Sequence, residues 1–111
     1  MEHILASVEL IENYSKNITH EDFAKNLAIQ DAIMRRLEII GEAVKNLSAS
    51  FKAKYPAVSW KQVAGMRNIL IHEYFGVDVK LVWSTVKIDM PVFKKQILEI
   101  LKKEFGLKRL V

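Results

Sequence analysis

The sequence predicts an all-α protein, an antiparallel bundle of four to five main helices. Apolar residues recur three or four positions apart along nearly the whole chain, which is the period of a helix with one buried face. No segment shows the strict alternation of apolar and polar residues that a half-buried strand requires. Because the connections look short, consecutive helices should pack antiparallel. We expect one helical domain over residues 1–111.

The first half of the chain carries the strongest helical signals. A helix is expected over residues 2–16, and Thr19 followed by Asp22 resembles a capping box that begins a short second helix. A long helix should then cover roughly residues 27–48. Its apolar positions form the longest series in the chain: Ile29, Ile33, Leu37, Ile40, Val44 and Leu47.

Capping residues and prolines divide the second half. A short helix within residues 48–55 should end before the proline that follows. Ser59 can cap a helix that begins at Trp60 and runs to about His72, and Asp78 can cap the next one.

The last helical stretch has a proline inside it and a glycine at its end. Pro91 should either kink the helix or begin a new one, and Gly106 is a suitable C-terminal stop. The apolar stripe expected along this stretch consists of Leu81, Val82, Val86, Met90, Phe93, Ile97, Leu101 and Phe105.

Composition excludes several classes of site. The chain has no cysteine, so it can form neither a disulfide nor a thiolate metal site. No apolar run approaches the roughly 20 residues of a membrane-spanning helix, and the first residues lack the basic start of a signal peptide. We therefore expect a cytoplasmic protein with no membrane partner.

Charge is distributed unevenly along the chain. Residues 1–50 hold five Lys/Arg and eight Asp/Glu, whereas residues 51–111 hold twelve Lys/Arg and five Asp/Glu. The basic half can attract a polyanion such as RNA, although a solvated helical surface would give the same counts.

The segment from Gly65 to Gly76 places a guanidinium, an imidazole and a phenol near the end of an apolar helix, on Arg67, His72 and Tyr74. Arginine binds phosphate through paired, planar hydrogen-bond donors, and histidine can accept or donate a proton near neutral pH. RNA carries its own nucleophile, the 2′-hydroxyl. Arg67 and His72 can therefore supply the cation and the proton acceptor that RNA cleavage needs, without a metal.

The spacing of these residues leaves alternatives open. Arg67 and His72 lie roughly 140° apart around an ideal helix, whereas Arg67 and Tyr74 are about 20° apart. The helix could loosen near His72, the arginine side chain could bend around it, or a two-fold dimer could gather both residues in one cleft. In a purely structural interpretation, His72 favours a helix C-terminus, Arg67 is a surface charge and Tyr74 is a core residue.

Other polar and aromatic residues have simpler interpretations. Glu38 and Glu42 favour a solvated helix face over a metal site, and Trp60 and Trp83 favour core packing over base stacking. Two further histidines are isolated in the sequence and expected to be exposed: His3 and His20.

The central segment resembles a known family. Arg67, His72 and Tyr74 match the Arg-x4-His-x-Tyr motif of HepT-like ribonuclease toxins in the HEPN superfamily. Residues 31–43 resemble the long second helix of that family, and the similarity extends from about residue 4 to residue 100.

The resemblance implies a dimeric helical bundle that is a metal-independent endoribonuclease toxin, with both motifs in a shared cleft. Arg67 and His72 would be its catalytic pair, supported by Asn68 and Glu73. The chain itself would need no cofactor. Its partner would be an MNT-type nucleotidyltransferase antitoxin, which uses ATP and magnesium to attach AMP to Tyr74. The alternative is a non-catalytic helical partner or substrate-binding module of a nucleotidyltransferase.

Overall fold

The computed structural model describes residues 1–72 and 78–106, and for residues 67–72 only the backbone is described. The elements in chain order are α1 (Glu2–Ser15), α2 (His20–Lys25), α3 (Leu27–Lys45), α4 (Ala49–Ala53), α5 (Trp60–His72), α6 (Val79–Ser84), the π-helix η1 (Thr85–Asp89) and α7 (Met90–Phe105). The four longest, α1, α3, α5 and α7, have 13 to 19 residues. The described residues are thus all-α, as the sequence predicts.

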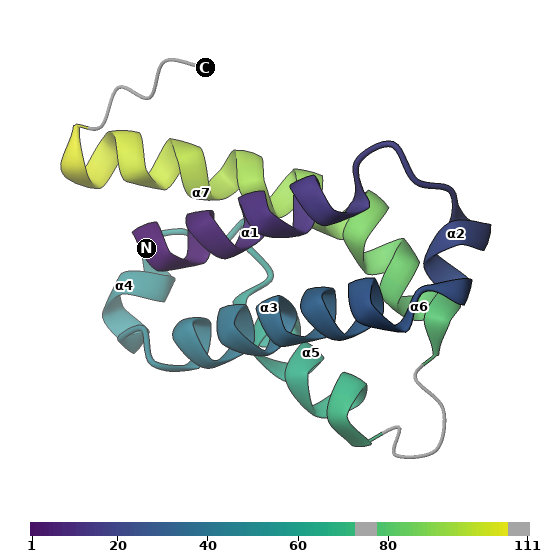
Figure 1. Ribbon diagram of the computed structural model, residues 1–111. Coiled ribbons are helices and arrows are strands. Elements are labelled where there is room, and N and C mark those ends of the chain that lie inside the picture. Colours follow the sequence, from purple (N-terminus) through teal and green to yellow (C-terminus); the bar gives the residue numbers. More distant parts are fainter. Residues whose placement is uncertain (73–77, 107–111) are drawn as a thin grey trace.

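The long helix α3 lies at the centre of the bundle. It packs against α1 on one side and α5 on the other, while α7 returns to pack against α1 (Figure 1). Ile33, Leu37, Ile40 and Val44 repeat along α3 and are fully buried. These four positions lie within about 60° of one another around the helix, so they form the single buried stripe that the sequence predicts.

Side-chain caps fix the start of several helices, as the sequence predicts. Thr19 and Asp22 form a reciprocal capping box at α2, with nitrogen–oxygen distances of 3.0 and 3.1 Å. The Asp78 carboxylate accepts a hydrogen bond from the Leu81 amide at 3.1 Å and begins α6. Gly106 ends α7 with a left-handed φ of 61°, a conformation that glycine adopts without steric cost.

The π-helix η1 lies within one continuous helical segment that runs from α6 into α7. Val82, Val86 and Met90 lie four residues apart and are all buried, so the segment keeps one face toward the core through η1. Pro91 follows in the first turn of α7, inside this continuous segment.

Two residues of the expected apolar stripe are not core residues. Leu81 is 40% exposed and Phe105 is 61% exposed. Leu81 lies beside Val82, which takes the buried position in α6, and Phe105 is the last residue of α7. A periodic pattern identifies which side chains share a helix face, but the neighbouring elements decide how much of that face is covered.

Candidate active site

Arg67 and His72 of the predicted motif lie in the C-terminal half of α5. The helix includes Arg67 and Asn68, and it ends at His72, where the sequence predicts its end. The structure thus brings the backbone of three predicted site residues onto one helix. Glu73 and Tyr74, the other two, lie outside the described residues.

The helix is continuous between Arg67 and His72. One of the three arrangements that the sequence left open, a helix that loosens near His72, can be followed only as far as His72, because residues 73–77 lie outside the described residues. At about 100° per residue, the two positions remain about 140° apart around α5. A bent arginine side chain and a two-fold dimer are the arrangements that would still bring the two groups together.

Helical register places these two residues on different sides of α5. Trp60 is buried and Val63 packs against the core, and Arg67 lies only about 20° from Trp60 by register. His72 instead lies about 20° from Lys61, which is exposed. The position of Arg67 thus lies on the side of α5 that faces the core. The position of His72 lies on the same side of α5 as the exposed Lys61.

Trp60 anchors the first turn of α5. Its indole nitrogen donates to the backbone carbonyl oxygens of Lys52 and Tyr55, at 3.1 and 3.0 Å. Its ring centroid lies 6.4 Å from those of Phe51 and Phe93. The prediction that Trp60 is a core anchor is confirmed. Its contacts hold the start of α5, the helix that also contains Arg67 and His72.

A hollow of about 780 Å³ lies along the first half of α5, and we call it the α5 groove. Lys61, Gly65 and Met66 line it from α5. Its other lining includes Leu81, Ile88, Asp89 and Val92, from the continuous segment of α6, η1 and α7. No sequence pattern predicts this groove, because the named residues of its two walls are 15 to 31 residues apart in the chain.

The α5 groove concentrates exposed apolar surface. Five large hydrophobic residues are exposed among the side chains described, those of residues 1–66 and 78–106, and three of them line this groove: Leu81, Ile88 and Val92. A Cβ atom added at Gly65 would meet no described atom within 4 Å, so none of the described residues covers α5 at this position. Contiguous exposed apolar surface on a globular protein usually marks an interaction site.

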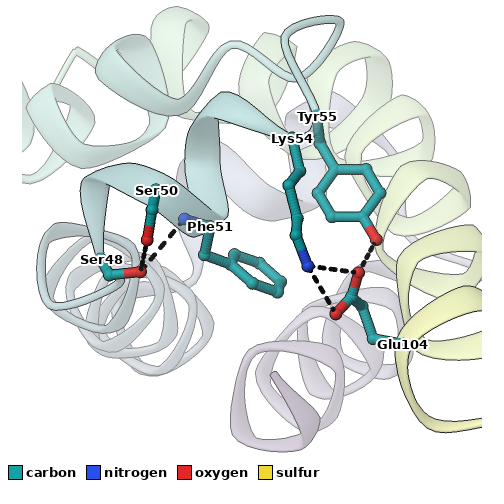
Figure 2. Close-up of polar contacts among 6 residues, drawn as sticks. All are labelled: Ser48, Ser50, Phe51, Lys54, Tyr55 and Glu104. Atoms are coloured by element: carbon teal, nitrogen blue, oxygen red, sulfur yellow. Dashed lines mark hydrogen bonds and ion pairs between the residues drawn. The ribbon is translucent and has the colours of Figure 1, made fainter.

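A second polar cluster joins α4 to the C-terminal end of α7. Figure 2 shows the Glu104 carboxylate accepting hydrogen bonds from the Tyr55 hydroxyl and, at 3.4 Å, from the Lys54 ammonium. The hydrogen bond to Glu104 raises the pKa of Tyr55 to about 12, helped by desolvation and the carboxylate charge. The same bond lowers the pKa of Glu104. Sequence analysis missed this cluster because Tyr55 and Glu104 are 49 residues apart.

His20 is not the isolated, exposed residue that the sequence predicts. Its ring centroid lies 5.9 Å from that of Trp83, and its Nε2 atom is buried without a hydrogen-bond partner. Phe23 packs on Trp83 at 5.1 Å, and the Lys87 ammonium lies 4.9 Å from the Trp83 ring centroid. Trp83 thus acts as the contact between α2 and the α6–η1 segment, which agrees with the predicted packing role.

Neither a metal-ligand cluster nor a membrane span is found in the described part of the chain. No three His, Asp or Glu side chains there lie close enough together to hold a metal ion. No helix in those residues is both long and apolar enough to cross a bilayer.

Comparison with known proteins identifies the family. The family model described as Ribonuclease HepT-like matches residues 4–100. The chain is 49% identical over 104 residues to "Putative RNase TTE0752" of Caldanaerobacter subterraneus subsp. tengcongensis, covering 94% of this chain and 93% of the relative. It is 48% identical over 94 residues to "Probable ribonuclease HepT" of Thermococcus cleftensis, covering 85% and 86% of the two chains.

A third relative is a longer protein. "Gamma-glutamylcyclotransferase and putative RNase MJ0434" of Methanocaldococcus jannaschii is 52% identical over 102 residues, which is 92% of this chain but 46% of the relative. No solved structure matches the chain. The family match over most of the chain agrees with the all-helical fold and with the resemblance seen in the sequence, and the chain belongs to the HepT-like ribonuclease family.

Proposed function

We propose that the chain is a HepT-type toxin, a metal-independent endoribonuclease whose catalytic residues are Arg67 and His72. The observation that carries the proposal is that both residues lie on the last turns of α5, within a chain that belongs to a ribonuclease family. The basic second half of the chain supports RNA as the substrate.

The chemistry needs only these two side chains and the substrate. His72 takes the proton of the ribose 2′-hydroxyl, and the 2′-oxygen forms a bond to the adjacent phosphorus. The bond from phosphorus to the 5′-oxygen breaks, which leaves a 2′,3′-cyclic phosphate, and the 5′-oxygen takes a proton from water as it leaves. Arg67 holds the phosphate oxygens and balances the charge that builds on them in the transition state. Asn68 and Glu73 support the site from neighbouring positions.

The active form in this proposal is a homodimer. A continuous α5 keeps Arg67 and His72 about 140° apart on one chain, and a two-fold axis close to α5 would gather two copies of each residue in one cleft. A shared cleft would also give the RNA backbone a larger cationic surface than one chain offers.

The proposed partner is an MNT-type nucleotidyltransferase antitoxin. It would use ATP and magnesium to transfer AMP to the hydroxyl of Tyr74, releasing pyrophosphate. The phosphodiester formed there carries about one negative charge at neutral pH, which would compete with the RNA phosphate for Arg67. The toxin would then be neutralised without a change of fold.

The test is an RNA-cleavage assay with purified variants. We expect His72→Ala and Arg67→Ala each to lower the rate about 100- to 10,000-fold while the circular dichroism spectrum stays helical. His3→Ala is the matched control, because His3 is exposed on α1 and should be dispensable. EDTA should leave wild-type cleavage unchanged. Full activity of His72→Ala, or a strict need for a divalent ion, would contradict the mechanism, and a chain with no activity at all would favour a binding module.

A further inference from the structure

The C-terminal ends of α3, α4 and α7 meet at one end of the bundle. The Lys52 ammonium of α4 donates to the carbonyl oxygen of Val44, in the last turn of α3, at 3.4 Å. Lys54 and Tyr55, which follow α4, contact the Glu104 carboxylate near the end of α7 (Figure 2). Three helix ends that are far apart in the chain therefore form one surface.

This surface is rich in lysine. The last four residues of the three helices, each with the residue that follows, hold five lysines and two glutamates, a net charge of +3. Lysine is favourable at a helix C-terminus, but each such end carries only about half a negative charge, so the three ends together balance about half of the excess. We call this surface the lysine-rich end, and its lysines are Lys45, Lys52, Lys54, Lys102 and Lys103.

An exposed aromatic ring lies beside these cations. Phe105 is the last residue of α7 and is 61% exposed, so none of the described residues buries its ring. Lys102 is exposed and lies three residues earlier, which makes the two side chains neighbours on the helix surface. Single-stranded nucleic acids are bound by this combination, because lysines contact the phosphates while an aromatic ring stacks on a base.

The lysine-rich end lies within reach of an RNA that occupies the motif. α5 begins beside α4, where the Trp60 indole nitrogen donates to the carbonyl oxygen of Lys52 at 3.1 Å. The 13 residues of α5 then rise about 20 Å to His72. A stacked strand rises about 3.4 Å per nucleotide, so about six nucleotides cover this length.

We propose that the lysine-rich end is a second RNA-binding site, which holds a single-stranded part of the substrate about six nucleotides or more from the bond that is cut. Phe105 stacks on a base, and Lys45, Lys102 and Lys103 contact phosphates. Glu104 opposes this binding, because it adds a negative charge and engages Lys54. The inference rests on the proposed function in taking RNA as the ligand.

Binding is tested with the full chain and a 2′-O-methyl RNA of about 20 nucleotides, which is longer than the distance to be spanned. This probe cannot be cleaved, because its 2′-oxygen is blocked. By fluorescence anisotropy, Phe105→Ala should weaken binding at least about fivefold through the loss of stacking. Lys102→Ala should reduce the slope of log K against log salt concentration by about 0.7, the value for one phosphate contact of a single strand.

Matched controls come from the other ends of the helices. Leu27→Ala removes a side chain that is 73% exposed at the start of α3, and Lys16→Ala removes an exposed lysine that follows α1. Both variants should bind the probe within about twofold of wild type, since neither residue belongs to the proposed phosphate or base contacts. Circular dichroism checks that every variant stays folded.

Glu104→Gln should change binding in the opposite direction. Loss of this carboxylate makes the surface more positive and releases Lys54, so binding should tighten and the salt slope should increase by about 0.7. A purely structural role of the contact predicts weaker binding instead, because the ends of α4 and α7 would separate. Weaker binding by Glu104→Gln, or wild-type binding by Phe105→Ala, would overturn the proposal.

Cleavage separates this inference from the proposed function. For the wild type, kcat/KM should be higher for an RNA of about 20 nucleotides than for one of about three, which is too short to reach both sites. Phe105→Ala should reduce this ratio at least about fivefold through the KM of the long RNA, and Leu27→Ala should preserve it. A wild-type chain that binds the probe through Phe105 but cleaves no RNA would contradict the ribonuclease proposal alone.

A wild-type chain that cleaves both lengths equally well would contradict this inference alone. Vesicles of anionic phospholipid provide the last comparison. If Phe105→Ala loses vesicle binding and keeps wild-type RNA binding, the lysine-rich end is a membrane contact and the RNA-binding proposal is wrong.

Discussion

At the scale of single residues, the clearest electrostatic feature is the contact of Tyr55 and Lys54 with Glu104. The sign of its effect on stability follows from the two pKa shifts. The raised pKa of Tyr55 stabilises the fold below the usual value of 10.0, and this contribution is lost as the pH rises toward 12. The lowered pKa of Glu104 stabilises the fold above its usual value of 4.5, and this contribution is lost as the pH falls below it. Because all three side chains are at the surface, the contribution should be small.

We therefore expect Glu104→Gln to return the pKa of Tyr55 toward 10.0. The loss of the carboxylate removes both the strongest acceptor and the negative charge that oppose ionisation of the phenol. The measurement is absorbance of phenolate against pH, with Tyr55→Phe used to assign one of the three tyrosine titrations. If the tyrosine removed by Tyr55→Phe titrates near its usual pKa in the wild type, the contact does not persist in solution.

Tyr74 is the other residue-scale prediction, and it concerns regulation. Tyr74→Phe should keep ribonuclease activity within a few-fold of wild type, because the phenol is not part of the proposed proton transfer. It should also escape neutralisation when the nucleotidyltransferase is co-expressed, since the hydroxyl that would accept AMP is gone. Mass spectrometry of the peptide containing residue 74 supplies the direct measurement. Neutralisation of Tyr74→Phe to the wild-type extent, without added AMP, would instead indicate steric inhibition.

At the scale of helices, sequence signals that act locally predicted structure well. The capping box at α2, the Asp78 cap, the glycine end of α7 and the extent of α5 all depend on residues close together in the chain. No local sequence signal predicted the π-helix η1. Pro91 indicates a kink or a new helix in this stretch, but a proline does not specify that the turn before it widens to a π-helix.

The Asp78 cap offers a prediction for one such element. Asp78→Ala should lower the free energy of unfolding by about 1 kcal/mol, because the Leu81 amide loses its acceptor at the start of α6. Asp78→Asn is the control, since an asparagine oxygen accepts the same bond and should preserve most of the stability. Urea unfolding followed by circular dichroism measures both. Equal losses in the two variants would show that charge, and not the hydrogen bond, is what matters at this position.

At the scale of the whole molecule, the fold class was predictable and the tertiary surfaces were not. Helical periodicity predicts the buried face of α3 and identifies Trp60 as a core residue. The motif directs attention to α5, but the α5 groove and the Tyr55–Glu104 contact join segments that are distant in sequence. His20 shows the same limit, since its place against Trp83 arises only when α2 folds back beside α6.

The antiparallel return of α7 along α1 has a consequence for how this domain can be combined with others. The N-terminal end of α1 and the C-terminal end of α7 lie at the same end of the molecule, and α5 ends well away from both (Figure 1). Polypeptide that precedes α1 or follows α7 therefore joins the bundle at the same end of the described residues, away from the end of α5. The longer Methanocaldococcus jannaschii relative, of which this chain spans 46%, fits such modular use.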